Sequence, residues 1–323
     1  MDFIDSSPIL AGLNYSKGQL LYRLGLRGHH SGSTAAAFSV DEAVSYIGRV
    51  VSDYLNYGAT GDHRMIAGKR ILEVGPGDNL GVAFRLLSLG AASVECLDAF
   101  EPVSNPGHNG LVYSALWHSM TDEERERVED IVRVELDHSI ALRTGDRLKI
   151  HYRAPIGTTE HLRLDYYDLV ISRAVLEHVD DVVAGWRRLR ESLRRDGEMW
   201  HEVDFRSHKM FDRIHPLYFL TWNERLWKII SSPDPTLNRC RLPVYRELLS
   251  KSFLASKVYV TRILNGSTLD PFVELPITRH HYSAQDLDDV RRIRPQLRPP
   301  FDSYSDEDLL ISGVFLVGRK KIQ

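Results

Sequence analysis

The sequence predicts an α/β fold: a doubly wound, mostly parallel, seven-stranded sheet with N-terminal helices and inserted cap segments. From residue 70 onward, short apolar strand patterns alternate with amphipathic helix patterns, which is typical of a parallel sheet covered on both faces. The first of these strands runs directly into a Gly-Pro-Gly turn at residues 75–77 and then into a helix. Five strands of this alternation and two late strand patterns make seven.

Composition and charge set the class of protein. With 323 residues the chain has room for about two domains of ordinary size. Apolar residues make up 43% of the chain and charged residues 26%, so a folded core is expected rather than disorder. The 44 acidic and 41 basic residues leave a net charge of −3. That charge gives no bulk attraction to nucleic acid or to an anionic membrane, so no nucleic-acid partner is expected.

Cysteine and histidine spacing argues against a metal site. Cys96 and Cys240 are the only cysteines and form no CxxC, which excludes a disulfide framework and a thiolate zinc site. The adjacent histidines at 29–30 and 280–281 have poor chelating spacing, so no metal is expected. The N-terminus has acids where a signal peptide carries bases, and no apolar run reaches about 20 residues. We therefore expect a cytoplasmic protein without a membrane span.

Residues 1–65 predict a helical cover. A short helical pattern lies at 18–26. Ser39, followed three residues later by Glu42, is a capping box and predicts a helix over 41–56. Apolar residues recur on one face of that helix at helical spacing. They are Ala43, Val44, Ile47, Val51 and Leu55.

Residues 66–205 predict the core of the sheet. A capping box from Thr121 to Glu124 begins a charged helix, and a later segment has strongly amphipathic spacing. The strands are expected at 70–74, 93–97, 147–152, 167–171 and 198–205. The helices between them are expected at 80–89, 121–136 and 180–195.

Two long connections interrupt the rest of the chain. A cap insertion is expected over 206–243, and the C-terminal part of the core, 244–323, carries strands at 257–263 and 309–317 around a second insertion at 265–307. Connections longer than about 15 residues are usually lids or substrate surfaces. The first connection contains Trp222, Trp227, Arg239 and Arg241. These residue types fit a lid over an oxygen-rich or anionic acceptor, or a helical cap that packs its own small core.

The decisive segment is the turn after the first strand. Gly75, Pro76 and Gly77 let the backbone approach a ligand closely, and the helix that follows offers free N–H donors. A dinucleotide site would need a third glycine where Leu80 stands. Glu73, at the end of the strand, would repel a pyrophosphate but suits an ammonium or a sulfonium group.

An acid after the second strand supplies the other half of a nucleotide site. Asp98 lies 98 − 77 = 21 residues beyond Gly77, about where units of this topology place the carboxylate that binds ribose hydroxyls. With the segments ILEVGPGDN, YDLVISRAVLEHVDD and DGEMWHEVD, these residues resemble the Rossmann-like class I S-adenosylmethionine-dependent methyltransferases, of the methyltransferase type 11 kind. The resemblance spans about residues 70–204.

The resemblance implies S-adenosyl-L-methionine as cofactor and a methyltransferase of class EC 2.1.1. The residues it implies for the cofactor are, from the methionine end to the adenine, Glu73, Gly75, Pro76, Gly77, Asp98, Ala99 and Phe100, with Ser172 near the sulfonium. The family often has an acid after the third strand that binds the adenine amino group. No acid falls in that place here, so the adenine contact stays unassigned.

Polar residues break the apolar pattern of the fifth strand, where His201, Glu202 and Asp204 stand. A central parallel strand should be apolar on both faces, so these residues are either paired or functional. Because ligands bind beyond the carboxyl ends of such strands, we expect the acceptor here. His178 or His208 is the candidate base, oriented by Asp204, and a structural histidine is the alternative, above all for His201. The residues expected to contact the acceptor are Arg173, Glu177, Glu202, Arg239 and Arg241.

The function predicted from these residues is methyl transfer from S-adenosylmethionine to a small-molecule or glycan acceptor. A non-catalytic protein that binds the cofactor, or an assembly subunit, is the alternative, because a fold does not dictate an activity. A dinucleotide-dependent enzyme with the same fold is less favoured. Neither the acceptor nor the oligomeric state is encoded in strand or helix spacing.

Overall fold

The computed structural model describes most of the chain, namely residues 37–100, 105–135, 139–145, 148–154, 162–207, 211, 214–231, 237–265, 268–269 and 272–320. The helix expected at 18–26 and the candidate base His208 lie outside these residues. Across the described ranges, no helix combines the length and the apolar character that a bilayer crossing requires.

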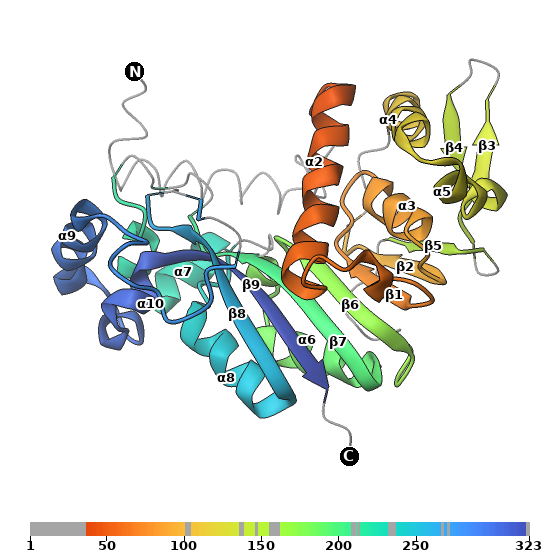
Figure 1. Cartoon of the computed structure of the whole chain (residues 1–323). Helices are drawn as coiled ribbons and strands as arrows, with labels where there is room; N and C mark the ends of the chain where they lie inside the picture. The colour runs from red at the N-terminus through yellow and green to blue at the C-terminus, as the bar shows by residue number, and fades with distance from the viewer. Residues whose placement is uncertain are drawn as a thin grey trace.

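Seven strands form one sheet in the order β5-β2-β1-β6-β7-β9-β8 (Figure 1). They are β1 (Arg70–Val74), β2 (Ser93–Leu97), β5 (Ile150–Arg153), β6 (Tyr167–Arg173), β7 (Leu193–Asp204), β8 (Phe253–Ile263) and β9 (Ile311–Lys320). Neighbouring strands run parallel except at β9, which is antiparallel to both β7 and β8. The predicted doubly wound, mostly parallel, seven-stranded α/β fold is therefore confirmed, with the late strands at its antiparallel edge.

The strand order fixes where a ligand can bind. The chain moves outward from β1 through β2 to β5 and then returns to the other side of β1 for β6 and β7. The order therefore reverses between β1 and β6. In open α/β sheets, ligands bind beyond the carboxyl ends of the strands at this switch point.

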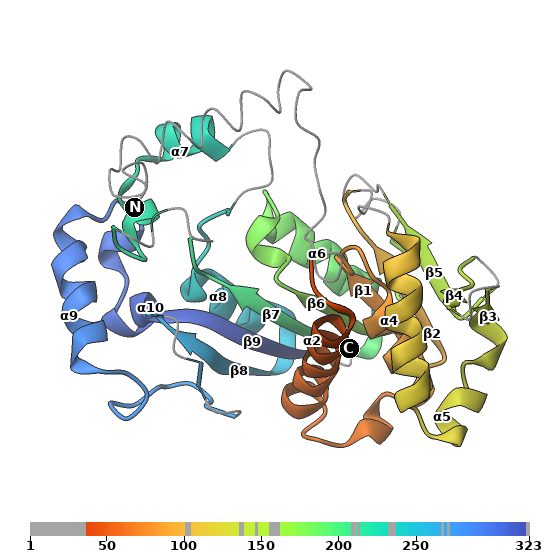
Figure 2. The same cartoon turned by 90° about the horizontal axis from the view of Figure 1, so that it is seen from above.

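Helices cover both faces of the sheet (Figures 1 and 2). On one face lie α2 (Val40–Asp53), α3 (Gly81–Ser88) and α4 (Pro106–Ser119), and on the other α6 (Val182–Ser192) and α8 (Leu242–Ser252). Alternate strand residues divide between two cores because successive side chains point to opposite faces. Ile71 belongs to the core of the α2 face, and Leu72 to the core of the α6 face.

The helix α2 begins at the predicted capping box. The Ser39 N–H donates to Glu42 Oε2 at 2.9 Å, and the Glu42 N–H donates to Ser39 Oγ at 3.3 Å. The helix buries Ala43, Ile47 and neighbouring valines against the sheet and ends earlier than predicted. A short π-helix, η2 (Tyr54–Gly58), follows it, and a 3-10 turn, η3 (His63–Met65), leads to β1.

The charged helix predicted over 121–136 is wrong beyond its first turns. Its capping box begins α5 (Asp122–Glu126), but a 3-10 turn η4 (Glu129–Ile131) and a strand β3 (Val132–Val134) follow. The strand pairs antiparallel with β4 (Ile140–Leu142) in a separate hairpin. The capping box settles where a helix starts and says nothing about its length, whereas the Val-Arg-Val alternation suits a strand.

The helix α4 has no counterpart among the predicted elements. Its start carries the ordinary signals, because Asn105 accepts the His108 N–H at 3.3 Å and Pro106 stands at the first turn. Its apolar residues do not gather on one face, which hides it from a periodicity argument. The sequence also predicts too long a helix at 180–195, since β7 already begins at Leu193.

The two long connections contain helices. The first, 206–243, includes η7 (Tyr218–Thr221) and α7 (Glu224–Ser231), and the second, 265–307, includes α9 (Ala284–Ile293), η8 (Arg294–Gln296), η9 (Phe301–Ser303) and the start of α10 (Asp306–Leu310). Trp227 is buried against Phe219, with ring centroids 6.1 Å apart, and Trp222 lies 5.8 Å from Phe211. Phe211, Phe219 and Trp227 belong to the same hydrophobic core as the α6 face of the sheet, and Trp222 packs against it, so the insertion does not form a separate core.

Candidate functional site

The turn after β1 has the backbone geometry that its glycines predict. Gly75 and Gly77 adopt φ angles of +70° and +74°, a region that side chains strongly disfavour. The Gly75 N–H donates to the Leu97 carbonyl at the end of β2, at 2.7 Å. A Cβ atom at Gly75 would collide with Val175 Cγ2. The turn is thus held against the neighbouring strand in a conformation that requires glycine.

Asp98 faces this turn, as the nucleotide hypothesis requires. Its Oδ2 accepts the Gly77 N–H at 3.3 Å, and its Oδ1 accepts the Phe100 N–H at 3.0 Å. The side chain is buried, and burial raises its pKa, while the two backbone N–H donors act in the opposite direction. The structure therefore brings a buried carboxylate, the glycine turn and residues 99–100 together at the ends of adjacent strands.

Glu73 is a buried carboxyl group beside the same turn. It is 5% exposed, and burial raises its pKa to about 7. The Cys96 thiol donates to Glu73 Oε2 at 3.5 Å. Within the described parts of the chain, no basic side chain forms an ion pair with it. A buried carboxylate without a cationic partner is unstable unless it is protonated or a positively charged ligand approaches.

Side chains of α4 hold the far side of the turn. Asn109 Nδ2 donates to the Asp78 carbonyl at 2.8 Å, and the Tyr113 hydroxyl accepts the Leu80 N–H at 3.0 Å. Asn79 Nδ2 donates to Asn109 Oδ1 at 2.8 Å. Sequence reasoning missed these residues together with α4. The Asn-Pro pair at 105–106, a helix-start signal, was the available clue.

The structure turns Ser172 away from Glu73. Ser172 pairs in register with Val74, so its side chain lies on the sheet face opposite to that of Glu73. Its hydroxyl lies 2.7 Å from His201 Nδ1, and both residues are fully buried. Trp186 of α6 packs 5.7 Å from the His201 ring, and burial lowers the pKa of His201 to about 3. This pair has the properties of a neutral structural contact in the core.

Arg173 and Glu202 lie at the carboxyl ends of β6 and β7, on the α2 face. Arg173 Nη1 is 2.7 Å from Glu202 Oε2 and 2.7 Å from Asp53 Oδ2, the latter at the end of α2. Its guanidinium also lies 5.9 Å from the ring centroid of Tyr46. Because Val74 pairs with Ser172, Arg173 follows beside the start of the glycine turn. Arg173 on β6 therefore lies about one strand spacing from the turn, and Glu202 on β7 lies about two.

Asp204, the predicted orienting carboxylate, is held by arginines. Arg206 Nε donates to its Oδ1 at 2.9 Å, and Arg262 Nη1 lies 3.4 Å from its Oδ2. The predicted base His178 stands in the 3-10 turn η6 (Leu176–His178). The Asp204 carboxylate is thus held by arginines at the carboxyl end of β7.

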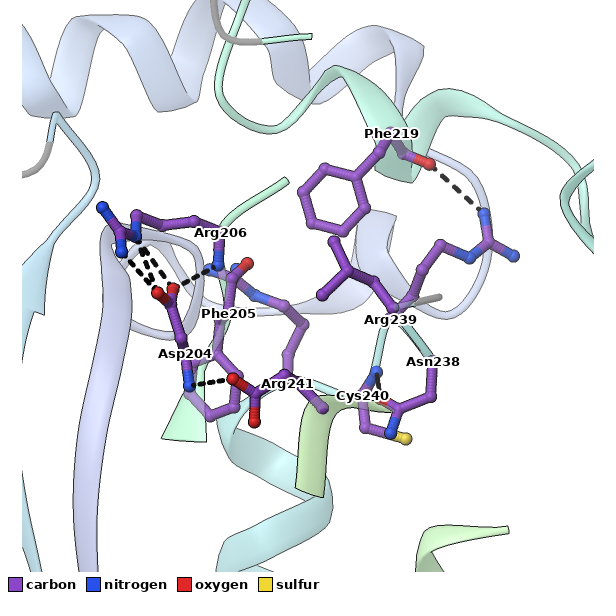
Figure 3. Close-up of a pocket in the computed structure, with 10 residues that line it drawn as sticks. Asp204, Phe205, Arg206, Phe219, Asn238, Arg239, Cys240 and Arg241 are labelled. Carbon is purple, nitrogen blue, oxygen red and sulfur yellow. Dashed lines mark hydrogen bonds and ion pairs between the residues drawn. The ribbon is translucent and has the colours of Figure 1, made fainter. Parts of the chain in front are cut away.

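Several predicted acceptor residues line a small cavity (Figure 3). Its volume is about 10 Å³, enough for roughly one water molecule. The lining residues are Glu177, Asp204, Phe205, Arg206, Phe219, Leu237, Asn238, Arg239, Cys240 and Arg241. Glu177 is buried, which raises its pKa well above the usual range, and its Oε1 accepts the Asp204 N–H at 3.3 Å.

The two arginines of this cavity donate to the protein itself. Arg239 Nη1 donates to the Trp222 carbonyl at 2.8 Å and to that of Phe219 at 3.3 Å, and its Nη2 pairs with Glu224. Arg241 is fully buried and donates to the carbonyls of Phe205, Asp308, Leu309 and Ile311, at 2.8–3.3 Å. Arg239 thus binds groups of the first insertion itself, whereas Arg241 joins the insertion to the end of β7 and to the junction of α10 and β9. In this arrangement neither guanidinium group is presented to a ligand.

Over the described ranges, no group of three or more histidine, cysteine, aspartate or glutamate residues is arranged to hold a metal ion. No protein-family model matches the chain, and no curated protein matches it.

Solved structures give distant likenesses. A methyltransferase from Mesorhizobium loti that depends on S-adenosylmethionine is 16% identical, with a TM-score of 0.40 over 81% of this chain and 100% of its own. A putative sarcosine dimethylglycine methyltransferase from Galdieria sulphuraria is 14% identical, with a TM-score of 0.42 over 96% of this chain and 99% of its own. A phosphoethanolamine N-methyltransferase from Haemonchus contortus is 14% identical, with a TM-score of 0.39 over 79% of this chain and 49% of its own. At such low scores, the chemistry of this chain has to be argued from its own residues.

Proposed function

We propose that this protein is a methyltransferase, of class EC 2.1.1, that transfers a methyl group from S-adenosylmethionine to a small-molecule or glycan acceptor. The observation that carries the proposal is the meeting of three features at the ends of β1 and β2. They are the left-handed Gly75–Gly77 turn, the Asp98 carboxylate 3.3 Å from the Gly77 nitrogen, and the buried Glu73. The proposed fit is to a ligand with a positively charged amino-acid end and a ribose.

Each of these groups has a chemical counterpart on the cofactor. Glu73, which lacks a basic partner among the described residues, would pair with the ammonium of the methionine end. The glycine turn would lie against that end, and Asp98 would accept hydrogen bonds from the ribose hydroxyls. Ala99 and Phe100 would flank the adenine. A pyrophosphate would meet Glu73 instead of free N–H donors, which argues against a dinucleotide.

The acceptor is proposed to lie beside Arg173 and Glu202, on the α2 face. A bound sulfonium supplies an activated methyl group, so the protein has chiefly to hold the acceptor in line with it, which can contribute several kcal/mol, about 7–11 at best. A hydroxyl acceptor would also need a base. We propose His178 for that role, and Asp204, which pairs with Arg206 and Arg262, as the residue that shapes the surrounding end of β7.

Calorimetric titration of the full chain with S-adenosylhomocysteine tests the cofactor site. The wild type is expected to bind, and Asp98→Asn to bind about tenfold to a hundredfold more weakly, since hydrogen bonds to a charged group contribute about 1.5–3 kcal/mol. Asp302→Asn, on an exposed turn, is the matched control and should bind as the wild type does.

Two results would contradict the proposal. One is the absence of binding by the folded wild type. The other is equal affinity for the wild type and Asp98→Asn, which would leave the ribose contact without a role. Binding without turnover across a panel of acceptors would instead favour the non-catalytic alternative.

A further inference from the structure

The glycine turn and its flanks are an irregular stretch of backbone between β1 and α3. Buried backbone N–H and C=O groups need hydrogen-bond partners, and a turn of this kind cannot obtain them from a strand ladder. Asp78 and Asn79 are each only 5% exposed, so water does not replace those partners. The tertiary structure therefore has to supply the partners that hold this stretch beside the left-handed glycine turn.

Helix α4 supplies the missing partners from its inner side. Asn109 Nδ2 donates to the Asp78 carbonyl at 2.8 Å, and the Tyr113 hydroxyl accepts the Leu80 N–H at 3.0 Å. These two contacts hold the residues that follow the glycine turn, whereas Leu97 and Asp98 contact the turn itself. The Tyr113 ring also packs in the core of the α2 face, 6.3 Å from the Phe84 ring, so it is the hydroxyl that serves the Leu80 N–H.

An amide pair completes the contact. Asn79 Nδ2 donates to Asn109 Oδ1 at 2.8 Å, and Asn79 Oδ1 accepts the Gly81 N–H at 2.6 Å. Each amide therefore acts as donor at one end and acceptor at the other, and only one orientation of the two groups satisfies all the contacts. An aspartate at position 109 has the same shape as asparagine but would place an acceptor against the Asp78 carbonyl, so the site requires the N–H donor as well as the shape.

The place of α4 in the chain links this contact to the ribose carboxylate. Pro106, where α4 begins, lies 106 − 98 = 8 residues after Asp98. Asp98 contacts the glycine turn directly. The helix that follows Asp98 in the chain contacts the residues after the same turn, through Asn109 and Tyr113. The two halves of the proposed cofactor site are joined through one helix.

We propose that Asn109 and Tyr113 are positioning residues, which hold the glycine turn in its cofactor-binding conformation through the Asp78 carbonyl, the Leu80 N–H and the Asn79 amide. The inference rests on the proposed function, because the ligand is S-adenosylmethionine. These side chains act on the backbone of the turn and need not touch the ligand.

The test compares variants that alter single atoms. Asn109→Asp keeps the shape and removes the donor to Asp78, and Tyr113→Phe removes only the hydroxyl that receives the Leu80 N–H. Each should weaken S-adenosylhomocysteine binding about tenfold in calorimetry, because a buried partner is left unsatisfied. Leu111→Ala, on the exposed side of the same helix, and Tyr282→Phe, in the second insertion, are the controls and should leave the affinity unchanged.

A second measurement separates positioning from general stability. The thermal midpoint of each unliganded variant is recorded, and affinities are compared well below the lowest midpoint. A double-mutant cycle uses Asn79→Ala, Asn109→Ala and the variant with both substitutions. If the two amides act as a unit, the double variant should bind S-adenosylhomocysteine as tightly as the single variant of lower affinity.

The outcomes are distinct for the two proposals. If the wild type does not bind S-adenosylhomocysteine, the proposed function fails and this inference fails with it. If the wild type binds, and Asn109→Asp and Tyr113→Phe bind equally well, the inference alone is overturned. If Asn109→Asp does not fold, Tyr113→Phe decides the question, because the loss of one oxygen leaves the ring packing intact.

Discussion

Two buried polar regions of this molecule, the glycine turn and the cap joint, differ in how their charges are compensated. By the cap joint we mean the surroundings of Arg239 and Arg241. At the turn, Glu73 is buried without a basic partner among the described residues. At the joint, Arg241 donates to four backbone carbonyls and Arg239 to two carbonyls and a carboxylate.

The comparison shows that the partners of a buried charge indicate its role. A charge whose hydrogen bonds all go to the protein stabilises the fold, whereas a charge that the protein leaves uncompensated needs a proton or a ligand. The same residue types that suggest a lid over an acceptor can therefore fasten an insertion to a sheet. Variants of each region should separate binding from stability.

The largest effect is expected at the cap joint. Arg241→Met should lower the free energy of unfolding by about 3–4 kcal/mol, because it leaves several buried carbonyls without donors. Affinity for S-adenosylhomocysteine, measured well below the unfolding transition, should be unchanged. Arg246→Met is the control: this arginine is 44% exposed and pairs with Asp308, so its loss should change stability by less than about 1 kcal/mol. An Arg241→Met protein of normal stability would contradict the structural role.

The next effect is expected at the turn. Gly75→Ala places a Cβ in the left-handed region and against Val175, so affinity for S-adenosylhomocysteine should fall about a hundredfold as the turn is displaced. Gly48→Ala is the matched substitution. Gly48 lies in α2, where a Cβ meets nothing within 4 Å, and alanine there should stabilise the helix by up to about 1 kcal/mol. Equal affinities for the two variants would argue against a ligand at this turn.

The smallest effect is the pH dependence that Glu73 confers. Because burial raises its pKa to about 7, the unliganded carboxyl is largely protonated below that pH, and an ammonium ligand must displace the proton. Affinity for S-adenosylhomocysteine should rise about tenfold per pH unit up to about pH 7 and level off above it. Titrations in two buffers of different ionisation enthalpy should detect one released proton at about pH 6.

The raised pKa of Glu73 has the opposite effect on the stability of the unliganded protein, which should fall as pH rises. Between the usual value of 4.5 and about 7, the folded unliganded protein binds more protons than the unfolded chain, so its stability should fall as pH rises through this window. Glu73→Gln should remove both dependences and bind weakly at every pH. Wild-type affinity that stays constant from about pH 5.5 to pH 7.5 would contradict the assignment.

Much of the fold could be predicted because its signals are local. The apolar strand before Gly75, the capping boxes at Ser39 and Thr121, and the late strand patterns each act within a few residues. The point at which a helix ends depends also on contacts with more distant residues. The segment after Glu126 became a hairpin because β3 pairs with β4, and α4 was missed because its apolar residues do not follow one face.

The candidate site divides in the same way. The glycine turn and Asp98 could be located from spacing, since a strand that ends in Gly-Pro-Gly and an acid 21 residues on encode their own geometry. The partners of Arg241 could not, because its acceptors include carbonyls 36 to 70 residues away. The contact of Ser172 with His201 and the hydrogen bond from Asn109 to the Asp78 carbonyl could not be predicted either, because both depend on how the helices and strands pack.

By itself, the sequence determined the strand–turn–helix that forms the glycine bend, the acid after the second strand and the class of sheet, because backbone conformation and hydrophobic periodicity are set by neighbouring residues. Only the tertiary structure decided which buried polar side chains the protein compensates, as it does Arg241, and which it leaves without a charged partner among the described residues, as it does Glu73. Compensation depends on atoms brought together from distant parts of the chain, and no short-range pattern records where those atoms will meet.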